Sequence, residues 1–318
     1  MKALIIGKND AEQRLDKFIT KTVKPLPISL MYRYIRTGHI KLNGKRCKNF
    51  TMLHEGDELK FFIPDEFFAK PDVRYPFLQA KRSLNILYED DHILLADKSV
   101  GLIVHSDEDS AGDTLIDRIQ KYLYEKGDYN PDEEHSFAPA LVNRIDRNTG
   151  GLVIAAKTAA ALRILSQKMK DREIDKRYLC IVHGKLPKKE DILTGYLEKN
   201  TDQNRVYISK TPAKDARSIR TKYRVIAEKE TYSLLEVELL TGRTHQIRAH
   251  LASIGHPLLG DGKYGTNALN KKSGYKTQAL YSYKLTFRFT TDAGELNELN
   301  NRTFEVRDIG FVLDFYSR

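Results

Sequence analysis

The sequence contains little cysteine, no tryptophan and no long apolar run. Its two cysteines, Cys47 and Cys180, stand far apart, which argues against a disulfide framework or a zinc cluster and suits a reducing compartment. No stretch approaches the roughly 20 apolar residues that a membrane-spanning helix needs. The N-terminus has only a short apolar patch at 3–6 before it turns charged, so it does not resemble a signal peptide. These absences predict a cytoplasmic protein without a membrane segment.

The chain is basic, with a net charge of +10 and a pI near 9.3, and this indicates a polyanionic partner. The excess is uneven, because residues 1–64 contain 13 Lys and Arg against 6 Asp and Glu, a difference of +7. With 318 residues, 41% of them hydrophobic, the chain is long enough for two packed domains. Charge alone leaves open whether the basic surface binds a ligand or meets only solvent.

Residues 1–64 have the pattern of two short helices and a small sheet. Apolar residues recur at helical spacing from Leu15 to Val23, and after a proline-rich break Ser29 is the expected N-cap of a second helix. An Asn-Gly pair at 43–44 lies between two strand-like pieces and predicts a hairpin. A further strand is expected over 58–63.

This block resembles the small αL RNA-binding domain of ribosomal protein S-four type. The resemblance rests on R-L-D at 14–16, R-Y-I-R-T-G-H-I-K-L-N-G-K at 33–45 and E-G-D at 55–57. It implies a domain over 1–64 whose basic side chains lie near one face and contact RNA phosphates, namely Arg33, Arg36, Lys45 and Arg46. The alternative is a basic face without a ligand.

We expect a linker over 65–84, where Pro71 and Pro76 interrupt a stretch without sustained periodicity. Over 85–318, hairpin-like strands alternate with a few helices, two of which are expected to open at Asp113 and Thr158. This pattern predicts an α+β domain with a large, mainly antiparallel sheet and flanking helices.

Polar residues crowd into one short segment, L-V-N-R-I-D-R-N-T-G-G at 141–151, just before a strand that reads as buried. Asp146 lies between two arginines in sequence, so its carboxylate is expected to stay ionised. An ionised, desolvated carboxylate can act as a nucleophile. From the residues alone, a structural salt bridge is the stronger interpretation.

Two further segments combine polar groups unusually. D-K-R-Y-L-C-I-V at 175–182 reads as a strand with a basic start and an aromatic residue, Tyr178. L-L-T-G-R-T-H-Q-I-R-A-H-L at 239–251 packs arginine, imidazole and amide side chains together, unlike a plain core helix. The alternative to a functional role is an ordinary strand tyrosine for the first segment and a purely structural helix for the second.

Together the three segments resemble the RluA family of pseudouridine synthases, in the family's order. The first is similar to the signature H-R-L-D-x-x-T-S-G, with Asn143, Ile145 and Gly150 as departures. The third matches G-R-T-H-Q-I-R-x-H-L almost letter for letter. The departures leave the aspartate in place, and the resemblance extends over nearly the whole chain.

The resemblance implies a role for each motif residue. Asp146 matches the catalytic aspartate, Arg144 the arginine that fills the space left by a flipped base, and Tyr178 the tyrosine that stacks on that base. Arg248 is our first choice for the partner of the aspartate, with Arg243 as the second choice and otherwise a phosphate or structural ligand. We also expect RNA contacts from three residues of the third segment: Arg243, His245 and Gln246.

Neither a cofactor site nor a metal site is expected. Residues 260–265 fit G-x-G-x-x-G, but no clear strand leads in and no apolar helical stripe follows. The histidines at 245, 250 and 256 lack both H-E-x-x-H spacing and nearby cysteines.

The sequence therefore predicts an RNA pseudouridine synthase that isomerises flipped uridines without a cofactor. Large-subunit ribosomal RNA is the leading substrate and transfer RNA the second, with no obligate protein partner and a monomeric state. A non-catalytic RNA-binding ribosome-assembly factor is disfavoured because Asp146, Tyr178 and Arg248 are all present. A glycosidase-like hydrolase is disfavoured because neither 141–151 nor 239–251 offers a second acidic residue.

Overall fold

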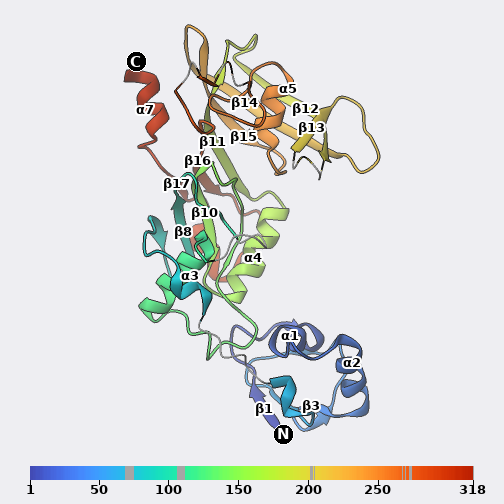
Figure 1. Ribbon diagram of the computed structural model, residues 1–318. Helices are drawn as coiled ribbons and strands as arrows, with labels where there is room; N and C mark the ends of the chain where they lie inside the picture. The colour runs from blue at the N-terminus through green and yellow to red at the C-terminus, as the bar shows by residue number, and fades with distance from the viewer. Residues whose placement is uncertain are drawn as a thin grey trace.

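The structure is a computed structural model that describes residues 1–68, 75–105, 112–200, 203, 205–266, 268, 270–271 and 274–317. The N-terminal part forms a four-stranded antiparallel sheet in the order β1-β6-β3-β4, a two-stranded pair β2-β5 and two helices (Figure 1). The elements are β1 (Lys2–Ile5), β2 (Gln13–Arg14), α1 (Leu15–Thr22), α2 (Ile28–Thr37), β3 (Ile40–Leu42), β4 (Lys45–Arg46), β5 (Met52–Leu53) and β6 (Glu58–Phe61).

The N-terminal core follows the sequence pattern. Helix α1 buries the apolar stripe that includes Leu15 and Phe18 against the sheet. The β3–β4 hairpin turns at Asn43 and Gly44, both with positive φ, as a two-residue Asn-Gly turn requires. Ser29 is not the N-cap of α2: the helix begins at Ile28, directly after Pro27, and no side chain caps it. Pro27 occupies the N-cap position instead, and its ring fixes φ there at −59°.

The described parts of the predicted linker divide between the two domains. A short 3-10 helix, Asp65–Phe68, packs its phenylalanines on the N-terminal core, whereas a second one, Pro76–Gln79, buries Phe77 in the core of the following domain. Pro71 lies outside the described residues. The boundaries 65 and 84 stay predictions.

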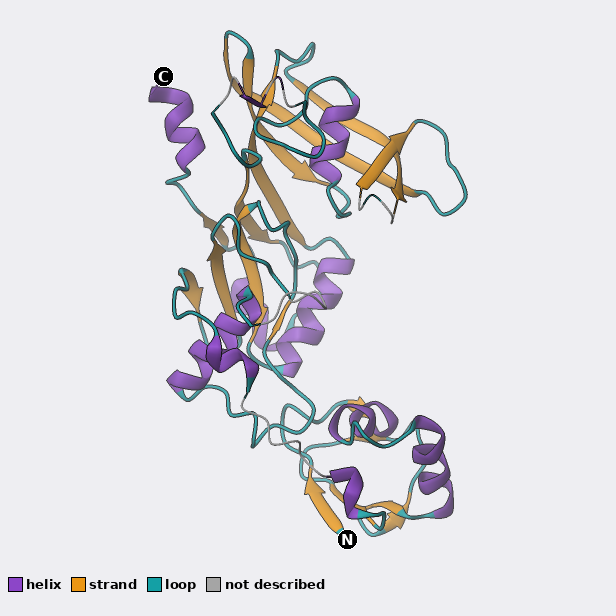
Figure 2. Ribbon diagram, in the orientation of Figure 1, coloured by secondary structure: helices purple, strands orange, loops and turns teal. Residues whose placement is uncertain are grey.

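An 11-stranded sheet forms the centre of the second domain in the described part of the chain, with the path β13-β12-β14-β15-β11-β16-β10-β8-β7 (Figure 2). All its pairings are antiparallel except β10–β16, which confirms the predicted α+β class. Its strands are β7 (Ile86–Glu89), β8 (Ile93–Lys98), β9 (Ala140–Leu141), β10 (Gly150–Ala156), β11 (Ile174–His183), β12 (Glu190–Asn200), β13 (Arg205–Ser209), β14 (Arg217–Lys229), β15 (Tyr232–Leu239), β16 (Leu280–Phe287) and β17 (Thr303–Glu305).

Helices cover both faces of the β8–β10 region. Helix α3 (Leu115–Lys126) packs on one face, and α4 (Ala159–Lys170) packs on the other, which is why every residue of β10 is buried. Thr158 caps α4 as expected, whereas the cap of α3 is Thr114 rather than Asp113, through a capping box with Asp117. The remaining elements are α5 (Gln246–Ser253), a 3-10 helix (Gly294–Leu299) and α7 (Gly310–Ser317).

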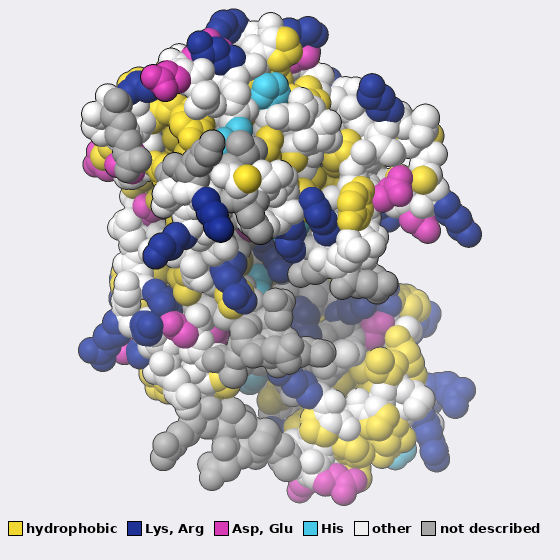
Figure 3. Space-filling view, turned by 45° about the horizontal axis from the view of Figure 1, so that its top comes forward, with side chains coloured by type: hydrophobic (Ala, Val, Ile, Leu, Met, Phe, Trp, Pro, Cys, Tyr) yellow, Lys and Arg dark blue, Asp and Glu magenta, His cyan; other side chains and the backbone are white. Residues whose placement is uncertain are grey.

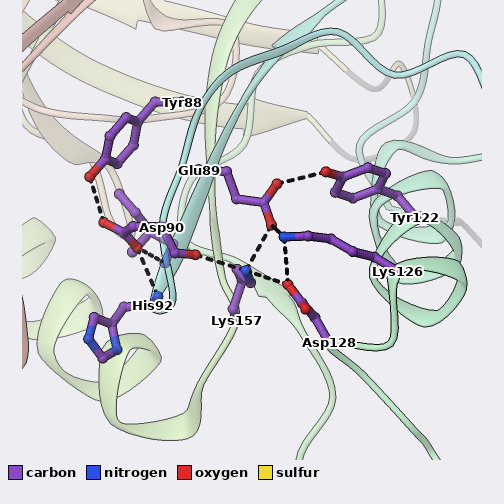
Figure 4. Close-up of polar contacts among 9 residues, drawn as sticks. Tyr88, Glu89, Asp90, His92, Tyr122, Lys126, Asp128 and Lys157 are labelled. Atoms are coloured by element: carbon purple, nitrogen blue, oxygen red, sulfur yellow. Dashed lines mark hydrogen bonds and ion pairs between the residues drawn. The ribbon is translucent and has the colours of Figure 1, made fainter.

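A polar network closes the end of β10 that lies away from Gly150 (Figure 4). The nearly buried ammonium of Lys157 contacts Glu89 at 2.8 Å and Asp128 at 2.7 Å, and Lys126 bridges the same two carboxylates. Burial would raise the pKa of Glu89, but the two ammonium groups and the Tyr122 hydroxyl hold it below its ordinary value. This network ties the strands to the end of α3.

The N-terminal domain docks on the loop before β9 and on the start of α4. The buried Asp10 carboxylate accepts hydrogen bonds from the backbone N–H and the hydroxyl of Ser136, at 2.8 and 2.6 Å. Asn9 accepts the N–H of Ala159, the first residue of α4, at 3.0 Å and donates to Glu134. These polar contacts hold the N-terminal domain against the second domain, near the start of α4 (Figure 1).

Candidate active site

Two glycines let the central strands meet. A Cβ on Gly150 would lie 2.5 Å from the Tyr281 ring, and a Cβ on Gly151 would lie 2.2 Å from the carbonyl oxygen of Ser282; Gly151 also has φ of +112°. Only glycine permits this approach of β10 to β16. Because Tyr178 of β11 pairs with Ser282, the close approach brings the second motif beside the first.

The loop that carries Asp146 is held by polar groups at both ends. The side-chain oxygen of buried Asn143, which stands where the family signature has histidine, accepts a hydrogen bond from the N–H of Ile154 at 2.8 Å and so anchors the loop to β10. At the other end, the Lys98 ammonium donates to the carbonyls of Ser99, Leu102 and Arg147.

No role was predicted for Lys98 from the sequence. The one indication in the sequence is that this lysine ends the apolar run of strand β8. Burial lowers its pKa to about 8, while the negative charges of Asp146 and Asp97 act in the opposite direction. Its three donors are saturated by backbone carbonyls, so it organises the loop and adds positive charge near Asp146.

Asp146 and Arg248 form the central ion pair, with Arg248 Nη1 2.8 Å from Asp146 Oδ2. The Arg248 side chain is 8% exposed and that of Asp146 24%. The other edge of the guanidinium binds Asp261, which is 0% exposed, through Nε at 2.7 Å and Nη2 at 3.0 Å. Arg144 and Arg147, the sequence neighbours expected to flank the carboxylate, are exposed instead. A distant arginine supplies the charge because successive loop side chains point in different directions.

His245 and Tyr264 complete the surroundings of the pair. His245 has a positive φ of 54° at the start of α5, which places its Nε2 3.9 Å from Asp146 Oδ2. Its Nδ1 lies 3.1 Å from the Tyr264 hydroxyl. The Tyr264 ring faces two guanidinium groups, that of Arg248 at 5.3 Å and that of Arg205 at 5.0 Å. Burial lowers the pKa of His245, although the negative charge of Asp146 acts in the opposite direction. The lowered pKa favours a neutral imidazole ring.

Tyr178 lies in the core below this pair, packed with Ile247 and partly buried Ile145. Burial raises its pKa to about 12, so its hydroxyl is a hydrogen-bond donor at neutral pH. Tyr178, Asp146 and Arg248 therefore come from three distant segments and meet at the centre of the sheet.

Gln246, which we expected to contact RNA, is not exposed at the surface where RNA could reach it. It is 2% exposed, and its amide donates to the Arg220 carbonyl and to Thr221 and accepts the Thr241 hydroxyl. All its polar atoms bind protein groups, so it fixes the start of α5. Arg243 and Arg144 are exposed beside the site, where a polyanion can reach them.

The four basic residues predicted in the N-terminal domain are all exposed. Arg46 lies against Gly38 at the end of α2, where a shallow hollow is lined also by Lys41 and the exposed Phe62. Figure 3 shows Lys and Arg side chains above and below the hollow in the middle of the face that it draws. The exposed surface of the N-terminal domain around 37–46 is thus basic.

The site has no metal-ligand arrangement: no three His, Cys, Asp or Glu side chains converge on a common point within the described ranges. None of the helices in the described part of the chain has the length and apolar composition needed to span a bilayer. The residues that could do chemistry are the carboxylate, the guanidinium, the phenol and the imidazole described above.

A carboxylate–arginine pair next to the central sheet, with exposed arginines close by and a separate small basic domain, is an arrangement that suits an enzyme acting on RNA. A family model described as RNA pseudouridylate synthase matches residues 92–253, and an S4 domain model matches 13–59. The chain belongs to the RNA pseudouridylate synthase family and is an isomerase with an N-terminal S4 domain.

Curated relatives extend the similarity over most of the chain. An uncharacterised RNA pseudouridine synthase of Mycoplasma genitalium is 32% identical over 289 residues, covering 89% of this chain and 88% of that protein. Ribosomal large subunit pseudouridine synthase C of Escherichia coli K12 is 31% identical over 298 residues, covering 91% and 89%.

Solved structures share the fold at lower identity. Human RNA pseudouridylate synthase domain containing 4 superposes with a TM-score of 0.56 at 18% identity, covering 72% of this chain and 90% of that one. Human RNA pseudouridylate synthase domain containing 1 gives 0.54 at 17% identity, covering 78% and 98%. Both likenesses concern the fold alone.

Proposed function

We propose that this enzyme converts uridines of large-subunit ribosomal RNA to pseudouridine, with Asp146 as the nucleophile. The ion pair of Asp146 with Arg248 carries the proposal, because it joins the two motifs that lie 102 residues apart. Relatives named for the large ribosomal subunit match about nine-tenths of the chain and support the choice of RNA. Transfer RNA is the second candidate substrate.

The target uridine has to leave its stack before its glycosidic bond can be reached, at a cost of a few kcal/mol. In the proposed complex, the exposed Arg144 occupies the vacated space and Tyr178 supports the extruded uracil. Exposed arginines such as Arg243 bind neighbouring phosphates.

The Asp146 carboxylate then attacks either C1′ of the ribose or C6 of the uracil, and the base rotates and rejoins through carbon. Arg248 orients the carboxylate through the 2.8 Å contact of its Nη1 and places a positive charge beside it. Reactant and product are isomers, so the stoichiometry requires neither a redox cofactor nor ATP. We further propose that the enzyme acts in the cytoplasm as a monomer without an obligate protein partner.

Replacing Asp146 by Asn tests the nucleophile. The amide keeps the shape but is not nucleophilic, so product formation should fall below measurable rates while RNA affinity changes little. Pseudouridine formation by Asp146→Asn at a tenth of the wild-type rate would rule out the assignment.

Mapping pseudouridines in cells that lack the protein tests the substrate. Loss of specific sites in large-subunit ribosomal RNA, with transfer RNA unchanged, is the expected result. Loss confined to transfer RNA would favour the second candidate. Complementation with wild type and with Asp146→Asn separates a missing modification from an indirect effect on ribosome assembly.

A further inference from the structure

The guanidinium of Arg248 is shared between two carboxylates. Nη1 binds Asp146, while Nε and Nη2 bind both oxygens of Asp261. Only the first carboxylate is assigned to the reaction. The second is the more deeply buried, and no role was predicted for it from the sequence.

Covalent catalysis changes the charge of this triad. Attack at C1′ forms a C–O bond and breaks the N1–C1′ bond, leaving the electron pair on uracil. Attack at C6 forms a C–O bond and moves the C5–C6 π pair toward C5 and the C4 carbonyl. By either route, the negative charge leaves Asp146 and appears on uracil, so Arg248 loses the charge of one partner. An unpaired buried cation is strongly unfavourable.

We propose that Asp261 is a positioning residue that keeps Arg248 paired and in place while Asp146 is covalently bound to the substrate. The inference rests on the proposed role of Asp146 as the nucleophile. When the covalent bond breaks again, the regenerated carboxylate finds the guanidinium at its original position. Asp261 acts through Arg248 and does not touch the substrate.

The surroundings of Asp261 suit a fixed anchor. Its Oδ1 accepts the backbone N–H groups of Lys263 and Tyr264, at 2.8 and 3.1 Å. Gly260, with φ of +76°, passes so close to Thr277 that a Cβ would lie 2.2 Å from its carbonyl oxygen. The Tyr264 ring lies against the face of the Arg248 guanidinium. Asp261 is thus held by backbone contacts that do not change when Asp146 reacts.

A stability cycle tests the pairing without relying on turnover. Either carboxylate alone leaves Arg248 with a partner, so Asp146→Asn and Asp261→Asn should each be tolerated. The double variant Asp146→Asn/Asp261→Asn leaves Arg248 as a buried cation without a carboxylate partner. The fold-increase of its unfolding equilibrium constant over wild type should exceed the product of the fold-increases of the two single variants by about 10-fold or more. As the matched control, Asp146→Asn combined with Asp128→Asn, in the distant Lys157 network, should be additive.

Adding Arg248→Met distinguishes charge pairing from shape. If the unpaired cation destabilises the double variant, replacing it with a neutral side chain of similar length should restore the lost stability. This holds even if the double variant fails to fold by itself. A triple variant no more stable than the double one would overturn the proposal, as would an additive cycle.

Single-turnover kinetics test the role in the reaction. The affinity of Asp261→Asn for RNA should stay within about 3-fold of wild type. Its chemical step should slow by about 100-fold or more, because Arg248 has no carboxylate partner once Asp146 is bonded to the substrate. An unchanged chemical step would overturn the inference. Turnover by Asp146→Asn would instead overturn the nucleophile assignment, so the two failures are distinguishable.

Discussion

Replacing Arg248 by Ala should destabilise the protein in a strongly pH-dependent manner. The change strands Asp261, whose carboxylate is fully buried and takes two hydrogen bonds from this arginine. Removing one partner of a buried pair costs about 3–5 kcal/mol. Asp146 suffers less, because its side chain is 24% exposed and water can replace part of the lost contact.

The sign of the pH dependence follows from the folded-state pKa of Asp261. Burial alone would raise this pKa, but Arg248 and the backbone N–H groups of 263 and 264 hold it below the ordinary value. In the wild type, the Asp261 carboxylate therefore stabilises the folded protein at pH values above its unfolded-state pKa of about 3.9. This stabilisation is lost as the pH falls through the pKa of Asp261 in the folded state. Without Arg248, burial dominates and the folded pKa lies above the unfolded one, so the penalty is full at neutral pH and is relieved on acidification.

Urea unfolding of wild type and Arg248→Ala at pH 7 and pH 5 measures this effect. The stability difference should be larger at pH 7. Arg243→Ala is the matched control, since its exposed side chain should change stability by no more than about 0.5 kcal/mol. A difference that is the same at both pH values, or equal losses for the two arginines, would refute the reasoning.

Three further changes probe other parts of the molecule. Asp10→Ala removes two hydrogen bonds to Ser136 and should loosen the docking of the N-terminal domain, seen as faster hydrogen exchange at the Ser136 amide with an unchanged exchange rate in α3. Replacing the four predicted contact residues together by Gln, namely Arg33, Arg36, Lys45 and Arg46, should reduce the slope of log affinity against log salt by roughly 3 to 4 units if each contacts a phosphate. An unchanged slope would mean that these four side chains meet only solvent. Gly151→Ala should prevent stable folding, because the added Cβ would overlap the Ser282 carbonyl. The control Gly56→Ala adds a Cβ in open space, also at a positive φ, and should lower the free energy of unfolding by only about 1 kcal/mol. Equal thermal midpoints for the two variants would contradict this.

Local sequence patterns determined most of the elements. The Asn-Gly turn at 43–44, the apolar run of β10 and the Thr158 cap are short-range features that neighbouring residues specify by themselves, and the structure contains each of them. The fold class followed from the spacing of such elements. The helix starts at Ile28 and Leu115 differed from expectation by a residue or two, since several nearby residues can serve as the cap.

The sequence alone also placed the reacting groups on three segments, through the resemblance of those segments to a known family. The resemblance also gave Arg248 as the first choice for the partner of Asp146, and the structure contains this pair. The other polar contacts around the site were decided only by the tertiary structure. Asp261 ends a segment, 255–261, that is similar to the family but to which no role was assigned from the sequence. Lys98 ends an ordinary strand, and Gln246 points inward although it stands among the candidates for RNA contact. Periodicity specifies a buried or an exposed face, but the partner of a charge depends on how distant strands pack, and here two glycines bring β10 and β16 together and with them the site.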